Sequence, residues 1–164
     1  PVVFLDFDGV LNSRAFWHRK KAAGEPLRGD DLDPDAIAHL NRLVAVSGVM
    51  CVVSSTWRLL HPKPELQRIL DAYGFTGELV DQTPELQERR HDERFWRTIE
   101  RGHEIQLWLN RNDVSPEQIV ILDDAEDMVH LTPRLVRTSA EVGLMAQDVD
   151  QALALWGIGV EAKA

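Results

Sequence analysis

Acidic residues follow two apolar stretches of the chain in a pattern that could bind a metal ion. Asp6 and Asp8 come directly after one apolar stretch, and Asp123 and Asp124 come directly after another. Clustered carboxylates repel one another, and their burial is costly unless a positive charge joins them. A hard divalent cation meets this need, and Mg²⁺ suits a site that combines a few carboxylates with a phosphate. The pattern therefore predicts a site for a divalent cation, and Mg²⁺ is the ion that suits it.

A third apolar stretch ends at Ser54 and Ser55 and adds hydroxyl groups to this set. In open parallel sheets, ligands bind beyond the carboxyl ends of the strands. If the three stretches are strands of one such sheet, their polar residues meet at the same edge. We therefore expect Asp6, Asp123 and Ser54 to lie close together.

The elements that must position these residues alternate between short apolar stretches and helical patterns. Strands are predicted at residues 2–5, 49–54, 78–80, 118–122 and 135–137. Proline and capping signals and apolar stripes predict helices that begin near residues 34 and 64 and helices around residues 105–109 and 149–156. This alternation implies an α/β fold, a Rossmann-like doubly wound parallel sheet of about five strands with helices on both faces.

Size and composition indicate one folded domain over residues 1–164, with 44% hydrophobic and 27% charged residues. No apolar run is long enough to cross a bilayer, so we expect no membrane partner. Cys51 is the single cysteine and lies in an apolar run, which favours a buried thiol and a cytoplasmic location. The net charge of −9 argues against indiscriminate nucleic-acid binding but is compatible with a local basic patch.

Three motifs resemble those of the haloacid dehalogenase (HAD) superfamily of phosphotransferases. The stretch DFDGV is similar to the first motif of that superfamily, Ser54 resembles the second, and the acid pair after QIVIL resembles the fourth. Their order and spacing also fit. The chain as a whole looks closest to the HAD domains associated with RNA repair, a resemblance carried by DFDGVLN, SSTWR, RGHEIQLWL and ILDDAEDM.

This resemblance implies a role for each acid. Asp6 would be the nucleophile that attacks phosphorus and forms an aspartyl-phosphate. Asp8 would protonate the leaving oxygen and then activate the water that releases phosphate. Mg²⁺ would be held by the Asp6 side chain, the Asp8 backbone carbonyl and Asp123. Asp124 would bind the metal through water or orient the site, and Asp127 is the alternative for that role.

The resemblance also implies groups that hold the phosphate. Ser54 would donate a hydrogen bond to a phosphate oxygen with Ser55 beside it, and Gly9 would permit a tight turn of backbone N–H groups toward the phosphate. The superfamily usually supplies a lysine before the helix that precedes the fourth motif, and this chain has none there. Arg101 is the best-placed cation to stabilise the transferred charge, and Arg97 is its competitor.

Two segments near the predicted site mix basic and aromatic residues. Residues 14–21 include Arg14 and Trp17, and residues 89–97 carry four arginines. Aromatic faces among cations suit stacking on single-stranded nucleotides, and we expect residues 14–21 to form a loop just outside the site. The alternative is that the aromatic side chains anchor loops to the core while the cations are solvated.

The gaps around the first two motifs look too short for an additional folded cap, so the fold is expected to be capless or to carry a minimal cap. An open site favours bulky substrates, because no lid must close around them. The leading hypothesis is a Mg²⁺-dependent phosphatase, acting on a phosphorylated substrate such as a polynucleotide end. The alternatives are a small-molecule or phosphoprotein phosphatase of the same fold and a non-catalytic phosphate- or metal-binding module. The oligomeric state is left open by the sequence.

Overall fold

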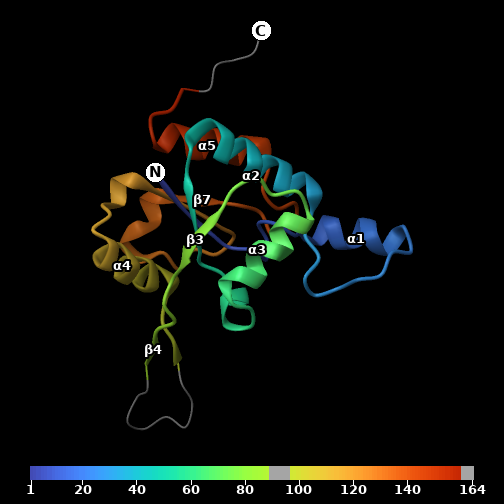
Figure 1. Ribbon diagram of the computed structural model, residues 1–164, viewed down its shortest axis with the longest axis horizontal. Coiled ribbons are helices and arrows are strands. Elements are labelled where there is room, and N and C mark those ends of the chain that lie inside the picture. Colours follow the sequence, from blue (N-terminus) through green and yellow to red (C-terminus); the bar gives the residue numbers. More distant parts are fainter. Residues whose placement is uncertain (89–96, 160–164) are drawn as a thin grey trace.

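The computed structural model describes residues 1–88 and 97–159 and contains a five-stranded parallel sheet (Figure 1). Its strands lie in the order β3-β2-β1-β6-β7. They comprise β1 (Val2–Leu5), β2 (Met50–Val53), β3 (Leu79–Gln82), β6 (Ile119–Asp123) and β7 (Leu135–Arg137). Neighbouring strands pair in parallel, so all their carboxyl ends lie at one edge. The predicted α/β class and doubly wound sheet are confirmed.

Helices cover both faces of this sheet (Figure 1). They are α1 (Arg14–Ala22), α2 (Pro34–Ser47), α3 (Lys63–Ala72), α4 (Arg101–Asn112) and α5 (Ala146–Leu155), with short 3₁₀ turns η1 (Thr56–Leu59), η2 (Pro116–Gln118) and η3 (Val129–Arg134). Alternate side chains of β1 point to opposite faces. Val3 and Leu5 belong to the core with α2, α3 and α5, whereas Val2 and Phe4 belong to the core with α4 and η3. Burial on both faces explains why the strands are almost wholly apolar.

Residues 14–21 form a helix, and the prediction of a loop there was wrong. Ser13 is the N-cap of α1, and its hydroxyl accepts a hydrogen bond from the backbone N–H of Phe16 (3.2 Å). Arg19, Lys20 and Lys21 occupy the last turn, where positive charge stabilises a helix. The helix was missed because Phe16 is its only buried residue, which leaves almost no apolar stripe in the sequence.

A two-stranded antiparallel ribbon of β4 (Gln87–Glu88) and β5 (Arg97–Thr98) projects from the body between β3 and α4 (Figure 1). The strands predicted from the sequence did not include β4 or β5. Among the described residues, no helix is long and apolar enough to cross a membrane.

Candidate active site

Asp6 follows β1 directly and is held in a fixed orientation at the carboxyl edge of the sheet. Only 5% of the residue is exposed. One carboxylate oxygen, Oδ1, accepts the backbone N–H of Phe7 (2.8 Å), and the other, Oδ2, lies 2.9 Å from Nη1 of Arg101. The nearby hydroxyl of Ser55 favours the ionised form of this carboxylate, which opposes the effect of burial on its pKa. The Asp6 side chain is therefore both buried and oriented before any ligand binds.

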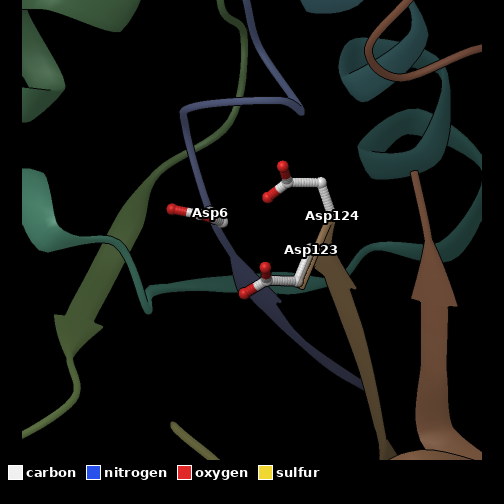
Figure 2. Close-up of side chains that lie close together, drawn as sticks. All are labelled: Asp6, Asp123 and Asp124. Atoms are coloured by element: carbon white, nitrogen blue, oxygen red, sulfur yellow. The ribbon is translucent and has the colours of Figure 1, made fainter. Parts of the chain in front are cut away.

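Asp123 is the last residue of β6, and Asp124 follows it at the same edge (Figure 2). Asp123 is fully buried; its Oδ1 accepts the backbone N–H of Ala125 (2.9 Å), and its Oδ2 lies 2.5 Å from Nη1 of Arg101. One oxygen from each of Asp6, Asp123 and Asp124 lies within 4.8 Å of the other two. This carboxylate cluster offers three hard oxygen ligands on adjacent strands.

The electrostatics of the carboxylate cluster follow from burial and crowding. Burial, together with the nearby charge of Asp6, raises the pKa of Asp123 to about 7, although Arg101 opposes the shift. Burial likewise raises the pKa of Asp6 above its ordinary value, against the effect of Arg101. Burial alone would lower the pKa of Arg101, but the two carboxylates raise it instead. The ionised cluster therefore destabilises the folded state, and additional positive charge would reduce this destabilisation.

Arg101 is the first residue of α4, and Asp127 fixes that end of the helix. Oδ2 of Asp127 accepts the backbone N–H of Arg101 (3.1 Å), and its carbonyl accepts that of Gly102 (3.0 Å). A Cβ on Gly102 would lie 2.2 Å from the carbonyl oxygen of Met128, so only glycine allows this close approach. Asp127 thus serves as a cap for α4, while Asp124 is the acid that lies with Asp6 and Asp123.

Ser54 lies beside Asp6, because Val53 pairs with Leu5 in the sheet. The residue is fully buried, and its hydroxyl oxygen has no hydrogen-bond partner in the described part of the chain. A buried hydroxyl without a partner is costly, and a ligand that accepts its hydrogen bond would remove that cost.

Asp8 does not join the carboxylate cluster through its side chain. Its Oδ1 accepts a hydrogen bond from Nδ2 of Asn12 and its Oδ2 from Nε1 of Trp57, both at 2.9 Å. Asp8 itself is solvent-exposed, in contrast to Asp6. The two acids of the first motif thus have different surroundings.

Gly9 makes the close packing of the two acidic segments possible. Its φ of +74° lies in the left-handed region, and a Cβ there would come within 2.5 Å of Cγ of Asp124. The carbonyl of Gly9 accepts a hydrogen bond from the hydroxyl of Thr138 (2.8 Å), which ties this turn to the end of β7. A side chain at this position would displace Asp124 from the carboxylate cluster.

Residues 2–149 match the family described as the HAD domain in Swiss Army Knife RNA repair proteins. The chain belongs to this family. The resemblance found in the sequence motifs is thereby confirmed, and membership implies a phosphatase-type hydrolase. No curated protein matches the chain.

Arg58 and Glu104 form a buried ion pair that connects two parts of this HAD domain and that sequence reasoning missed. Nη2 of Arg58 lies 2.7 Å from Oε2 of Glu104, and the two side chains are only 4% and 5% exposed. The guanidinium also donates to the carbonyls of Ser55, Thr83 and Pro84. Arg58 lies in SSTWR and Glu104 in RGHEI, two of the stretches that carried the family resemblance. Nothing in either stretch indicated that these two side chains form a pair.

Two of the four cations of α1, Arg19 and Lys20, form close ion pairs within the HAD domain. Nη2 of Arg19 lies 2.8 Å from Asp33, and Nζ of Lys20 lies 3.0 Å from Asp31. Phe16 is buried, and Trp17 is half-buried with its ring centroid 5.1 Å from that of Phe16.

Arg14 remains the more available candidate for substrate contact. Its side chain is 72% exposed, and its nearest acid, Glu141, lies 3.8 Å away. Residues 89–96 of the second basic-aromatic segment lie outside the described residues, as does the side chain of Arg97.

Proposed function

We propose that this HAD domain is a Mg²⁺-dependent phosphatase that hydrolyses phosphomonoesters through an aspartyl-phosphate on Asp6. The proposal rests on one observation: the carboxylate cluster and Arg101 lie beside the hydroxyl of Ser54, which has no hydrogen-bond partner among the described residues. Carboxylate oxygens supply the metal ligands, and the arginine and the serine supply donors for phosphate oxygens. A site built only to bind metal would need neither of these donors.

The donor set of the carboxylate cluster fits Mg²⁺, which prefers carboxylate oxygen and keeps several waters. Asp6 and Asp123 would hold the ion together with the backbone carbonyl of Asp8, and Asp124 would act directly or through water. A bound Mg²⁺ supplies charge neutralisation, so that an anionic carboxylate can approach an anionic phosphate.

In the first step, a carboxylate oxygen of Asp6 forms a bond to phosphorus while the bond from phosphorus to the leaving oxygen breaks. Asp8 transfers its proton to that oxygen, so the alcohol leaves in its neutral form. Ser54 donates a hydrogen bond to a phosphate oxygen, and Arg101 stabilises the charge that develops. Its side-chain donors other than Nη1 make no hydrogen bond among the described residues and are available for this contact.

In the second step, water attacks the phosphorus of the aspartyl-phosphate, and the acyl-phosphate bond breaks. Asp8, now ionised, accepts the proton of that water, which returns both acids to their starting states. Inorganic phosphate is the product.

Without bound metal, the stability of the protein should depend on the protonation of the carboxylate cluster. Because the pKa of Asp123 rises from 3.8 to about 7 on folding, the native state retains a proton that the unfolded state has lost. The contribution of Asp123 to stability therefore falls as pH rises through this window. Mg²⁺ competes with this proton, so the increase in melting temperature on adding Mg²⁺ should be larger at about pH 8 than at about pH 5.5.

Thermal unfolding of the metal-free protein with and without MgCl₂ measures this effect. Asp123→Asn should flatten the pH dependence, because the titrating group is gone. A Mg²⁺-induced increase that is the same at both pH values in the unaltered protein would contradict the assignment of Asp123 as a ligand.

We further propose that the phosphate is carried on a nucleic-acid end. The family is described from RNA repair proteins, which favours such a substrate. The start of α1 lies next to the site, because Asn12 contacts Asp8 and Ser13 caps the helix. Arg14 is exposed at this end of the helix, and Lys21 is exposed in its last turn and forms no ion pair among the described residues. Trp17 offers a half-exposed ring between them.

Activity on a phosphorylated oligonucleotide should therefore exceed activity on the matching mononucleotide, and the advantage should shrink with added salt. Replacing Arg14 and Lys21 by glutamine should reduce the slope of log kcat/KM against log salt by about 1–2 for the oligonucleotide only. Arg111→Gln is the matched control, since Arg111 is exposed in the last turn of α4, far along the helix from Arg101. Equal kcat/KM for both substrates at all salt concentrations would favour a small-molecule or phosphoprotein substrate instead.

A further inference from the structure

The turn η1 follows Ser54 and Ser55 and brings an indole ring against the exposed acid of the first motif. Nε1 of Trp57 donates a hydrogen bond to Oδ2 of Asp8, and Nδ2 of Asn12 donates to Oδ1, each at 2.9 Å. Each oxygen of the Asp8 carboxylate therefore has one fixed donor. We call Trp57 and Asn12 together the Asp8 clamp.

Both members of the Asp8 clamp are themselves held in place. The Trp57 ring lies 5.0 Å from the ring of Phe7 between centroids, and only 7% of the residue is exposed. Its backbone N–H donates to the hydroxyl of Ser55 (3.3 Å). The amide of Asn12 is fixed at its other end, because its Oδ1 accepts the backbone N–H of Gly9 (3.1 Å). The clamp is therefore a rigid support for an acid that is otherwise exposed to solvent.

We propose that Trp57 is a positioning residue that orients Asp8 for proton transfer to the leaving oxygen; the inference rests on the proposed function. An exposed aspartate side chain has several rotamers, and only some of them direct an oxygen toward the leaving group. Each carboxylate oxygen has two lone-pair directions. The clamp occupies one on each oxygen, so the proton that Asp8 donates or accepts lies in a remaining direction. The orientation is then set before the substrate binds.

The same geometry gives Trp57 a task other than nucleotide stacking. Its ring is buried against Phe7 and its only N–H is used by Asp8, so neither its face nor its donor is free for a base. Trp57 acts through its hydrogen bond to the acid, so it is a positioning residue and not a catalytic one.

The test compares leaving groups. The quantity compared is kcat/KM, which includes the attack of Asp6 and the departure of the leaving group but not the later hydrolysis of the aspartyl-phosphate, in which Asp8 also acts. Trp57→Phe keeps an aromatic ring but removes the N–H, so kcat/KM for an alkyl phosphate should fall by about ten- to a hundredfold. For p-nitrophenyl phosphate, whose leaving group needs little protonation, kcat/KM should stay within about threefold. Trp156→Phe is the matched control, because it also removes an indole hydrogen bond, to the carbonyl of Gln118 (3.1 Å), at the end of α5.

A second measurement does not depend on turnover. The chain has five tryptophans, and the indole N–H resonance that disappears in Trp57→Phe identifies Trp57 in a ¹H–¹⁵N spectrum. Asp8→Ala should shift that resonance, because its hydrogen-bond acceptor is gone. Should Trp57→Phe fail to fold, Asn12→Ala should show the same selective loss on the alkyl phosphate.

The inference is overturned if kcat/KM falls equally for both substrates, if it falls for neither, or if Asp8→Ala leaves the indole resonance in place. These outcomes differ from failure of the proposed function, in which the unaltered protein hydrolyses neither substrate; that result would overturn both.

Discussion

Asp6→Asn is expected to lower phosphatase turnover by at least about a thousandfold while the protein stays folded. A carboxamide is a poor nucleophile and a poor metal ligand, so the variant loses the attacking oxygen and part of the metal site together. The fold should persist because the amide oxygen can still accept the N–H of Phe7, and Arg101 keeps its contact with Asp123. Phosphate release and far-ultraviolet circular dichroism measure the two effects.

The matched control is Asp113→Asn, which makes the same chemical change at the exposed end of α4. Asp113 has a φ of +52°, a region that asparagine adopts readily, so its replacement should leave activity and stability unchanged. Activity of Asp6→Asn within about tenfold of the unaltered protein would exclude Asp6 as the nucleophile.

Intact-mass measurement after an acid quench distinguishes the role of the nucleophile, Asp6, from that of the general acid, Asp8. The unaltered protein and Asp8→Asn should carry a phosphoryl group during turnover, because each retains the attacking carboxylate, whereas Asp6→Asn should carry none. A protein that binds Mg²⁺ and phosphate but never gains a phosphoryl group or releases phosphate would be a non-catalytic binding module.

The sheet and its polar edge could be predicted because buried parallel strands impose a simple pattern on the sequence. Strands covered on both faces are apolar throughout, so β1 and β6 ended visibly at Asp6 and Asp123. Parallel strands bring their carboxyl ends together whatever the length of the connections between them. The proximity of Asp6, Asp123 and Ser54 therefore followed from local patterns and one rule of topology.

The contacts that depend on distant partners could not be predicted in this way. Arg19 and Lys20 looked like free cations because their acids, Asp33 and Asp31, lie in the loop after the helix and carry no pairing signal. Nothing in the sequence pairs Arg58 with Glu104, because this partner on α4 is 46 positions away. A burial pattern reveals which apolar residues face the core, but it does not reveal which charged residue is buried with a partner.

The buried ion pair leads to the largest expected effect on stability. Arg58→Met keeps much of the side-chain volume but leaves Glu104 buried with the N–H of Leu86 as its remaining donor (2.9 Å). The carbonyls of Thr83 and Pro84 lose the guanidinium as a donor as well, whereas the carbonyl of Ser55 keeps the backbone N–H at position 58 (3.2 Å). We expect the free energy of unfolding to fall by about 3–5 kcal/mol, because an unpaired buried charge is costly.

Urea unfolding, followed by circular dichroism, measures this loss against two comparisons. Glu141→Gln breaks the exposed pair with Arg14, whose side chains are 72% and 56% exposed, and should change the free energy of unfolding by less than about 1 kcal/mol. Arg58→Met combined with Glu104→Leu removes both charges and should recover much of the loss, because no buried charge then lacks a partner. If Arg58→Met costs no more than Glu141→Gln, water reaches Glu104 and the pair does not tie η1 to α4. A double variant less stable than Arg58→Met would instead show that Glu104 is stabilised mainly by Leu86 and not by the arginine.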